Sequence, residues 1–181
     1  MKIVKYKKIS STSEIAKKLR PQPWTIILAD EQKRGYGREQ REWFSPKGGL
    51  YFTIVLPKVD IADLQVLTLL AAFSVSKTVK EKFNLETFIK MPNDVLIISS
   101  PNSRGLKLKK ICGILTENVI GKDVKFSIMG IGLNTNIKSF PKDLKDIATS
   151  IEIETGRKTN NEKILLAIID GIKNNLKTIT Q

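Results

Sequence analysis

Apolar positions along the chain follow two spacings, one typical of strands and one typical of helices. Short apolar runs between turn-forming residues predict strands at 3–6, 25–29, 50–56, 88–90, 95–98, 110–116 and 124–132. Apolar residues at helical spacing predict a long helix over 63–83 and a terminal amphipathic helix over 163–176. This pattern predicts an α+β fold, with a mixed, largely antiparallel sheet and helices packed on one face.

Polar, capping and turn-forming residues mark the segments between these elements. Ser11 at the N-cap, with Glu14 three residues on, has the form of a capping box and predicts a short helix that Pro21 ends. Residues 99–107 carry Pro, Asn, Ser and Gly and are expected to form an exposed hairpin loop. Residues 141–147 are expected to be irregular or briefly helical.

The composition shows a strongly positive net charge and excludes several kinds of catalytic site and covalent link. The chain has 181 residues, of which 41% are hydrophobic, as expected of one globular domain over 1–181. Its net charge of +13 predicts an anionic partner such as a nucleotide, a nucleic acid or an acidic protein surface. The lack of histidine excludes His-based triads, and the single Cys112 excludes an internal disulfide. The sequence contains neither a signal peptide nor a membrane-spanning stretch, so a cytoplasmic location without membrane association is expected.

A glycine-rich, basic loop follows the predicted strand at 25–29. It reads Asp30-Glu31-Gln32-Lys33-Arg34-Gly35-Tyr36-Gly37-Arg38 and continues to Trp43. Glycines let backbone N–H groups approach an anion closely, and arginines supply forked donors that match phosphate oxygens. The loop therefore predicts a site for a nucleotide or an acyl phosphate, although a solvated hairpin loop explains the same residues.

Four further motifs follow this loop in order. They are Ser45-Pro46-Lys47-Gly48-Gly49-Leu50-Tyr51, Lys90-Met91-Pro92-Asn93-Asp94, Lys110-Ile111-Cys112-Gly113-Ile114-Leu115-Thr116-Glu117 and Gly130-Ile131-Gly132-Leu133-Asn134-Thr135-Asn136. Taken together, the loop and these motifs resemble the catalytic domain of biotin protein ligases, over roughly residues 10 to 136. The resemblance implies a fold like that of class II synthetases.

The resemblance also implies a reaction. In this family biotin attacks the α-phosphate of ATP with the help of Mg²⁺, forming biotinyl-5′-AMP and pyrophosphate. A lysine of a biotin carboxyl carrier protein then displaces AMP. Relatives commonly add a C-terminal SH3-like barrel or an N-terminal DNA-binding helix-turn-helix. This sequence shows neither, so we expect a non-repressor ligase domain that does not bind DNA, and the resemblance leaves room for a homodimer.

Individual residues take roles by matching the family motifs. Arg38 and Lys110 match the catalytic residues. Lys110 is preferred over Lys109 because side chains alternate along a strand and Lys110 has the family's three-residue spacing to Gly113. Asp94 is the candidate ligand for Mg²⁺, although a turn aspartate is the competing interpretation. The residues expected to bind biotin are Ser11, Thr12, Gln32, Gly35, Lys110 and Gly113. Those expected to bind the nucleotide are Arg38, Trp43, Asn93, Asp94 and Asn134.

Two positions depart from the family pattern, and two rival functions stay open. Met91 replaces a tryptophan, and Tyr36 stands where many relatives carry arginine, so one ligand contact is expected to be missing. The hydroxyls of Ser11 and Thr12 also suit a helix cap. The closer rival is a lipoate or octanoyl ligase or transferase of the same superfamily. The other is a basic nucleic-acid-binding module, which the low aromatic content of 7% disfavours.

Overall fold

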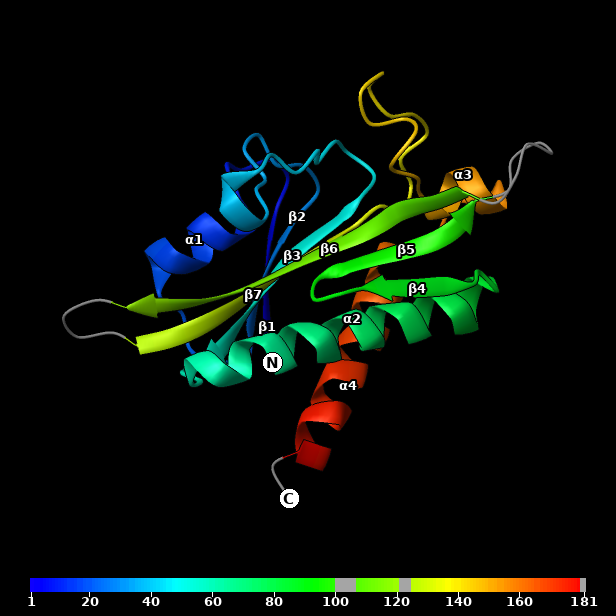
Figure 1. Cartoon of the computed structure of the whole chain (residues 1–181). Helices are drawn as coiled ribbons and strands as arrows, with labels where there is room; N and C mark the ends of the chain where they lie inside the picture. The colour runs from blue at the N-terminus through cyan, green and yellow to red at the C-terminus, as the bar shows by residue number, and fades with distance from the viewer. Residues whose placement is uncertain (100–106, 121–124, 180–181) are drawn as a thin grey trace. The chain divides into compact units, whose positions relative to one another are not determined.

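The structure, a computed structural model, describes residues 1–99, 107–120 and 125–179 (Figure 1). Most of the expected hairpin loop at 99–107 therefore lies outside the described residues. The chain divides into two compact units, one formed by Met1–Thr68 with Ile114–Gly132 and the other by Leu69–Gly113 with Leu133–Gln181. Each unit is described by itself below, and the single domain over 1–181 stays a prediction.

The first unit is built on strands that the sequence predicted closely. It contains β1 (Lys2–Tyr6), β2 (Thr25–Ala29), β3 (Leu50–Pro57), nearly all of β7 (Lys125–Leu133) and the second half of β6 (Lys107–Ile120). Within this unit the strand order is β1-β2-β3-β7-β6. β1 pairs with β2 in parallel and β2 pairs with β3 antiparallel, which confirms the mixed character of the sheet.

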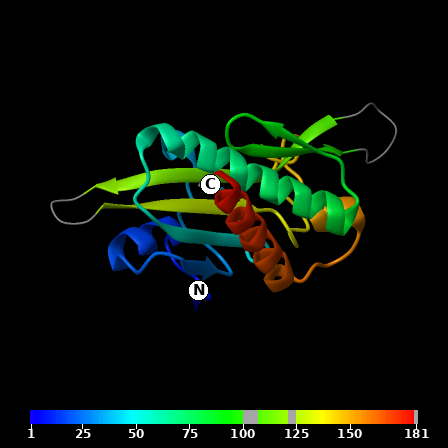
Figure 2. The ribbon, with the colours of Figure 1, turned by 90° about the horizontal axis from the view of Figure 1, so that it is seen from below.

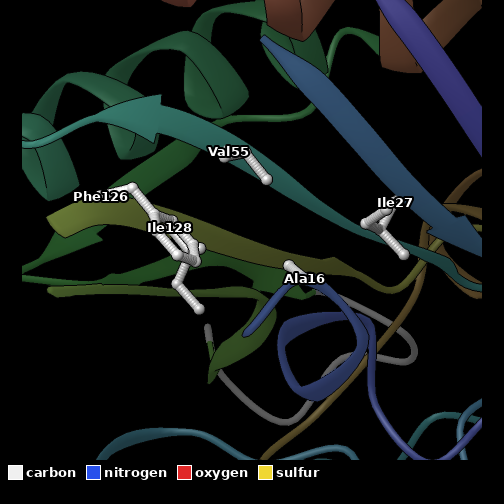
Figure 3. Packing of buried hydrophobic residues seen from close by; sticks show 5 residues of the cluster. All are labelled: Ala16, Ile27, Val55, Phe126 and Ile128. Carbon is white, nitrogen blue, oxygen red and sulfur yellow. The ribbon is translucent and has the colours of Figure 1, made fainter. Parts of the chain in front are cut away.

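The first helix covers one face of these strands. α1 (Thr12–Leu19) is capped by Ser11, as predicted, because Ser11 Oγ accepts a hydrogen bond from the Ser13 amide at 3.2 Å. In a capping box this bond would come from the amide three residues on, at Glu14, and here it comes from the amide two residues on. Arg20, in the left-handed region at φ 47°, ends the helix before Pro21. Figure 3 shows the core beneath α1, where Ala16 lies among the buried side chains of Ile27, Val55, Phe126 and Ile128.

Helices lie on both faces of this part of the sheet, which corrects one detail of the expected fold. From Leu50 to Leu56 every side chain of β3 is buried, so both of its faces are covered. On β6, Glu117 bonds to Lys17 of α1, whereas its neighbour Thr116 bonds to Thr68 of the first turns of α2. Because neighbouring strand residues point to opposite faces, α1 and the start of α2 lie on opposite sides.

The second unit has three paired strand segments of its own. It contains β4 (Thr87–Lys90), β5 (Asp94–Ser99) and the first half of β6, in the order β6-β5-β4. Both pairings are antiparallel, and the ladder places Asp94 opposite Gly113 and Leu96 opposite Lys110. The register shifts between Val95 and Leu96, which marks a bulge.

Helices pack closely within the second unit. α4 (Asn161–Ile179) crosses the part of α2 (Ile61–Phe83) that belongs to this unit, as Figures 1 and 2 show. The crossing depends on Gly171, because a Cβ there would lie 3.2 Å from the Cβ of Ser74. The sequence did not predict the five-residue helix α3 (Ile151–Thr155), which Ser150 caps at its start and Gly156 at its end. Among the described helices, none combines the length and apolar character needed to cross a bilayer.

Candidate active site

Gln32 and Thr12 form the polar centre of the first unit. Gln32, just after β2, accepts hydrogen bonds through Oε1 from the amide of Thr12 at 2.8 Å and from its hydroxyl at 3.1 Å. Its Nε2 donates to Ser45 Oγ at 2.9 Å. Ser11 therefore caps the helix while Thr12, which is 4% exposed, holds Gln32. Thr12 and Gln32, two of the six residues expected to bind biotin, are thus in direct contact with each other.

The hydrogen bonds around Gln32 continue in one direction through Thr53 and Ser45, neither of which was among the residues expected at the site. Thr53 Oγ1 of β3 donates to Thr12 Oγ1 at 2.8 Å, and Ser45 Oγ donates to the carbonyl of Trp43 at 2.8 Å. The chain runs from Thr53 through Thr12, Gln32 and Ser45 to the Trp43 backbone. Hydrogen bonds linked head to tail polarise one another, so this row orients the amide of Gln32.

Two glycines let neighbouring groups pack against the backbone at this site. A Cβ on the buried Gly35 would lie 2.8 Å from Gln32 Nε2 and closer still to Ser45 Oγ. A Cβ on Gly132 of β7 would lie 2.7 Å from Cε2 of Trp43, so the indole lies directly on the strand backbone. Gly35 is thus required for packing around Gln32, and Trp43 has a defined seat in the first unit.

The glycine-rich loop folds back on itself as a small hairpin. The amide of Gly37 donates to the Arg41 carbonyl at 2.8 Å, and the amide of Trp43 donates to the Gly35 carbonyl at 2.8 Å. Arg38 opens the short 3-10 helix η1 (Arg38–Gln40) at the tip. Glu39 and Gln40 both have positive φ, at 56° and 57°, a conformation that stores strain in residues other than glycine.

The cations of this hairpin differ in whether they are paired. Arg41 makes an ion pair with Glu39 at 2.7 Å, inside the hairpin. Lys33, Arg34 and Arg38 are exposed and make no ion pair with any described residue. Arg38, the predicted catalytic arginine, is therefore available to an anionic ligand, whereas Arg41 is already neutralised.

Tyr36 makes contacts that sequence reasoning missed. Lys17 Nζ lies 3.0 Å from the Tyr36 hydroxyl, 2.9 Å from Glu117 Oε1 and 5.4 Å from the centre of the Tyr36 ring. Burial opposes the charge on Lys17, but the bonds to Tyr36 and Glu117 outweigh it and raise the pKa of Lys17. Burial also raises the pKa of Tyr36, against the pull of Lys17. The one sequence feature that pointed to this cluster was Glu117, which is the last residue of the motif that starts at Lys110.

In the second unit, Lys110 and Asp94 face each other across paired strands. Lys110 Nζ lies 2.7 Å from Asp94 Oδ1, and the two side chains are 31% and 20% exposed. Lys109 instead donates to the carbonyl of Lys145 at 2.8 Å. The two neighbouring lysines therefore have separate partners, as strand alternation predicts. Alternation fails just beyond, because Ile111 and Cys112 are both fully buried next to the bulge.

Two residues expected near the nucleotide have different settings in the second unit. Asn134 is 2% exposed and donates through Nδ2 to the carbonyl of Thr149 at 3.0 Å, while its backbone bonds to Ile111 and Ile151. It holds the segment before α3 in place, and its role toward adenine stays a prediction. Asn93 lies half-buried in the turn that precedes β5. Cys112 is a fully buried thiol whose pKa is raised by burial, and it fills space in the core.

Residues 6–134 match the sequence pattern of the biotin/lipoate A/B protein ligase family. The match covers well over half of the chain, and it includes every motif except the last two residues of the final one. The chain belongs to this family. Its fold class, an α+β arrangement around a mixed and mostly antiparallel sheet, is confirmed by solved relatives.

Two solved relatives have been determined with biotin and ATP or with biotinyl-5-AMP. The biotin protein ligase of Aquifex aeolicus, solved with biotin and ATP, superimposes with a TM-score of 0.84 at 34% identity, covering 97% of this chain and 70% of that one. The enzyme of Leishmania major, solved with biotinyl-5-AMP, gives a TM-score of 0.74 at 25% identity, with coverages of 94% and 73%.

Curated relatives point to the same family. The bifunctional ligase/repressor BirA of Bacillus spizizenii is 37% identical over 169 residues, which are 89% of this chain and 49% of the relative. The protein of the same name from Bacillus subtilis is 38% identical over 150 residues and is covered to 43%. The chain thus spans about half the length of the first curated relatives that it matches.

Proposed function

We propose that the chain activates biotin with ATP, forming biotinyl-5′-AMP and pyrophosphate, and passes the biotinyl group to a lysine of a biotin carboxyl carrier protein. The observation that carries the proposal is the Gln32–Thr12 pair, in which the amide of a half-buried glutamine meets the hydroxyl of a threonine that is 4% exposed. Such groups can exchange their mutual hydrogen bonds for those of the cyclic urea of biotin. The named ligands of the solved relatives support the same assignment.

Charge placement supports the roles of the two cations. Lys110 carries its ammonium group on a strand, held by Asp94, where it can neutralise a carboxylate and an α-phosphate that must approach each other. Arg38 is exposed on a loop, with no acidic partner among the described residues, and its fork suits the phosphate of the adenylate. The chemistry needs little more than positioning and charge neutralisation from the protein.

Mg²⁺ is part of the proposal because ATP normally carries it. No group of three or more His, Cys, Asp or Glu side chains gathers within the described residues. This fits a cation that is held mainly by phosphates, since Mg²⁺ in such sites takes only one or two carboxylates from the protein. Asp94, next to Lys110, is the carboxylate that we assign to it, with one oxygen already bonded to Lys110. Mg²⁺ would supply charge neutralisation at the phosphates.

Two further assignments follow from this reaction. The acceptor is expected to be a biotin carboxyl carrier domain, and the protein is expected to act in the cytoplasm, where ATP is available. The lipoate or octanoyl alternative is not favoured, because relatives that match most of this chain, from Paracoccus denitrificans and Aquifex aeolicus, are named for biotin. A homodimer stays an expectation.

Pyrophosphate release tests the proposal directly. Purified protein is incubated with ATP and either biotin, lipoate or no acid, with and without Mg²⁺. Release that requires both biotin and Mg²⁺ is the expected result. A response to lipoate without a response to biotin would show that the ligand has been wrongly assigned. Thr12→Val, which keeps the shape of the side chain and removes its hydroxyl, should raise the KM for biotin by roughly 10-fold, as expected for a buried hydrogen bond.

A further inference from the structure

Three side chains from distant parts of the chain meet beside the glycine-rich hairpin. Lys17 comes from α1, Tyr36 from the hairpin and Glu117 from β6. Lys17 Nζ bonds to both others, at 3.0 Å and 2.9 Å, and the Tyr36 hydroxyl lies 3.4 Å from Glu117 Oε2. The side chains of Lys17 and Glu117 are 34% and 24% exposed, so the ion pair is partly shielded from solvent.

Tyr36 attaches the tip of the hairpin to the rest of its unit through a side chain, whereas the base of the hairpin is held by backbone bonds from Lys33 and Arg34 to the carbonyls of Ile9 and Ser10. Within residues 33–40, it alone makes side-chain bonds outside the hairpin, since Glu39 bonds to Arg41 and the other charged side chains have no described partner. Gly35 and Gly37 flank it, and the hairpin continues directly into Arg38. Fixing the tyrosine ring therefore fixes the backbone two residues before the catalytic arginine.

The cluster is built so that the hydroxyl is central. An ion pair between Lys17 and Glu117 alone would tie α1 to β6 and leave the hairpin untouched. The Tyr36 hydroxyl joins this pair as a third member, and the ammonium also lies against the tyrosine ring. Groups in such a network act together, so the loss of one weakens the hold of the others.

We propose that Lys17 and Glu117 are positioning residues, which hold Tyr36 and so keep the hairpin in the conformation that presents Arg38 to the adenylate. The proposal rests on the proposed function for the role of Arg38. It gives a purpose to Tyr36, which departs from the arginine of many relatives. In this chain the side chain at this position contacts Lys17 and Glu117 and so anchors the loop.

Hydrogen exchange of the ligand-free protein tests the anchoring without any assay of activity. Tyr36→Phe removes only the hydroxyl, and Lys17→Met removes the charge while keeping a long apolar side chain. Each variant should raise exchange in residues 35–43 by about five-fold, the effect of one lost hydrogen bond. The double variant should exceed neither single one by much, because both break the same contact. Lys18→Met, at the exposed neighbouring position, is the matched control and should leave exchange unchanged.

Retention of biotinyl-5′-AMP tests the functional part. Tyr36→Phe should release the adenylate about five-fold faster while the KM for biotin stays as in the wild type, and Lys17→Arg, which keeps a cationic donor, should behave like the wild type. If Tyr36 had a purely structural role, Tyr36→Phe would change the thermal stability of the protein. It would not speed adenylate release while leaving the KM for biotin unchanged. Glu117→Gln provides a second variant that keeps the shape of the side chain.

Each arm has an outcome that overturns the proposal. Exchange that is unchanged in Tyr36→Phe, or additive effects of Tyr36→Phe and Lys17→Met, would show that the cluster does not hold the hairpin. Normal adenylate retention in a variant with a loosened hairpin would show that the hold does not serve Arg38. Failure of the proposed function is separate, since it appears as absent pyrophosphate release in the wild type.

Discussion

Lys110 and Asp94 form an ion pair across the β5–β6 ladder, with 2.7 Å between Nζ and Oδ1. The antiparallel register brings them together. Asp94 lies opposite Gly113, Lys110 lies opposite Leu96, and the bulge between Val95 and Leu96 separates the two pairs. The ion pair with the carboxylate limits the movement of the ammonium group before any ligand is present. A preset cation of this kind avoids reorganisation when negative charge gathers at a phosphate.

Lys110→Ala should slow adenylate formation by about 10²–10³, the usual loss for a charge aimed at a developing charge. Lys109→Ala is the matched control, since Lys109 bonds to the Lys145 carbonyl at the exposed surface and should change the rate little. Single-turnover release of pyrophosphate measures both. Similar small effects from the two variants would mean that the wrong lysine has been placed at the reaction.

Arg38→Gly should make the enzyme lose its intermediate. Lys110 remains, so biotinyl-5′-AMP still forms, but the exposed arginine no longer holds it against water and stray amines. The measurement is biotin incorporation into serum albumin beside a cognate carrier domain, with Arg41→Gly as the control, because Arg41 is already paired with Glu39. Loss of activity on both acceptors would instead place Arg38 in the formation of the adenylate.

Residues 33–44 should become protected from hydrogen exchange when biotin or the adenylate binds. Lys33, Arg34 and Arg38 lack acidic partners among the described residues, so an anionic ligand supplies contacts that the free hairpin does not have. Protection factors with and without biotin plus ATP give the answer. Equal protection in both states would leave the segment as an ordinary solvated hairpin.

Gly35→Ala should weaken biotin binding by at least about 10-fold and lower the free energy of unfolding by about 1–3 kcal/mol, as overpacking usually does. The new methyl group would lie 2.8 Å from Gln32 Nε2 and would push the amide out of line. Gly37→Ala is the control, because the atom that its new methyl group would approach is the Arg41 carbonyl oxygen at 3.9 Å, an ordinary contact. Calorimetry and thermal unfolding measure the two effects, and an unperturbed Gly35→Ala variant would contradict the packing.

Cys112 should be unreactive toward thiol reagents in the folded protein up to at least about pH 9, well above the point where an ordinary thiol reacts readily. Burial raises its pKa despite the nearby charge of Lys110, so the thiolate is disfavoured as well as covered. Because the folded pKa is the higher one, this contribution to stability is complete below the ordinary thiol pKa and declines as the pH rises above it. Rapid labelling of native protein near pH 8 would contradict the assignment.

Most of the strands and helices could be predicted because each depends on local spacing. The apolar run of β2, the apolar stripe of α4 and the cap at Ser11 all lie within a few residues of chain. α3 was missed because five residues are too few to show a periodicity, and its caps, Ser150 and Gly156, resemble ordinary turn residues. The placement of helices on both faces was also missed, because a strand buried on both sides, such as β3, does not say what covers each face.

The sequence by itself determined the family and the residue types of the chemistry, since glycines, arginines and a strand lysine recur there at fixed spacing. Only the tertiary structure decided which groups touch. Gln32 is bound by Thr12 from a helix and by Ser45 from the far side of the hairpin, and Tyr36 is held by Lys17 and Glu117. These partners lie far apart along the chain, and a hydrogen bond depends on distance and angle in space, which no spacing in the sequence encodes.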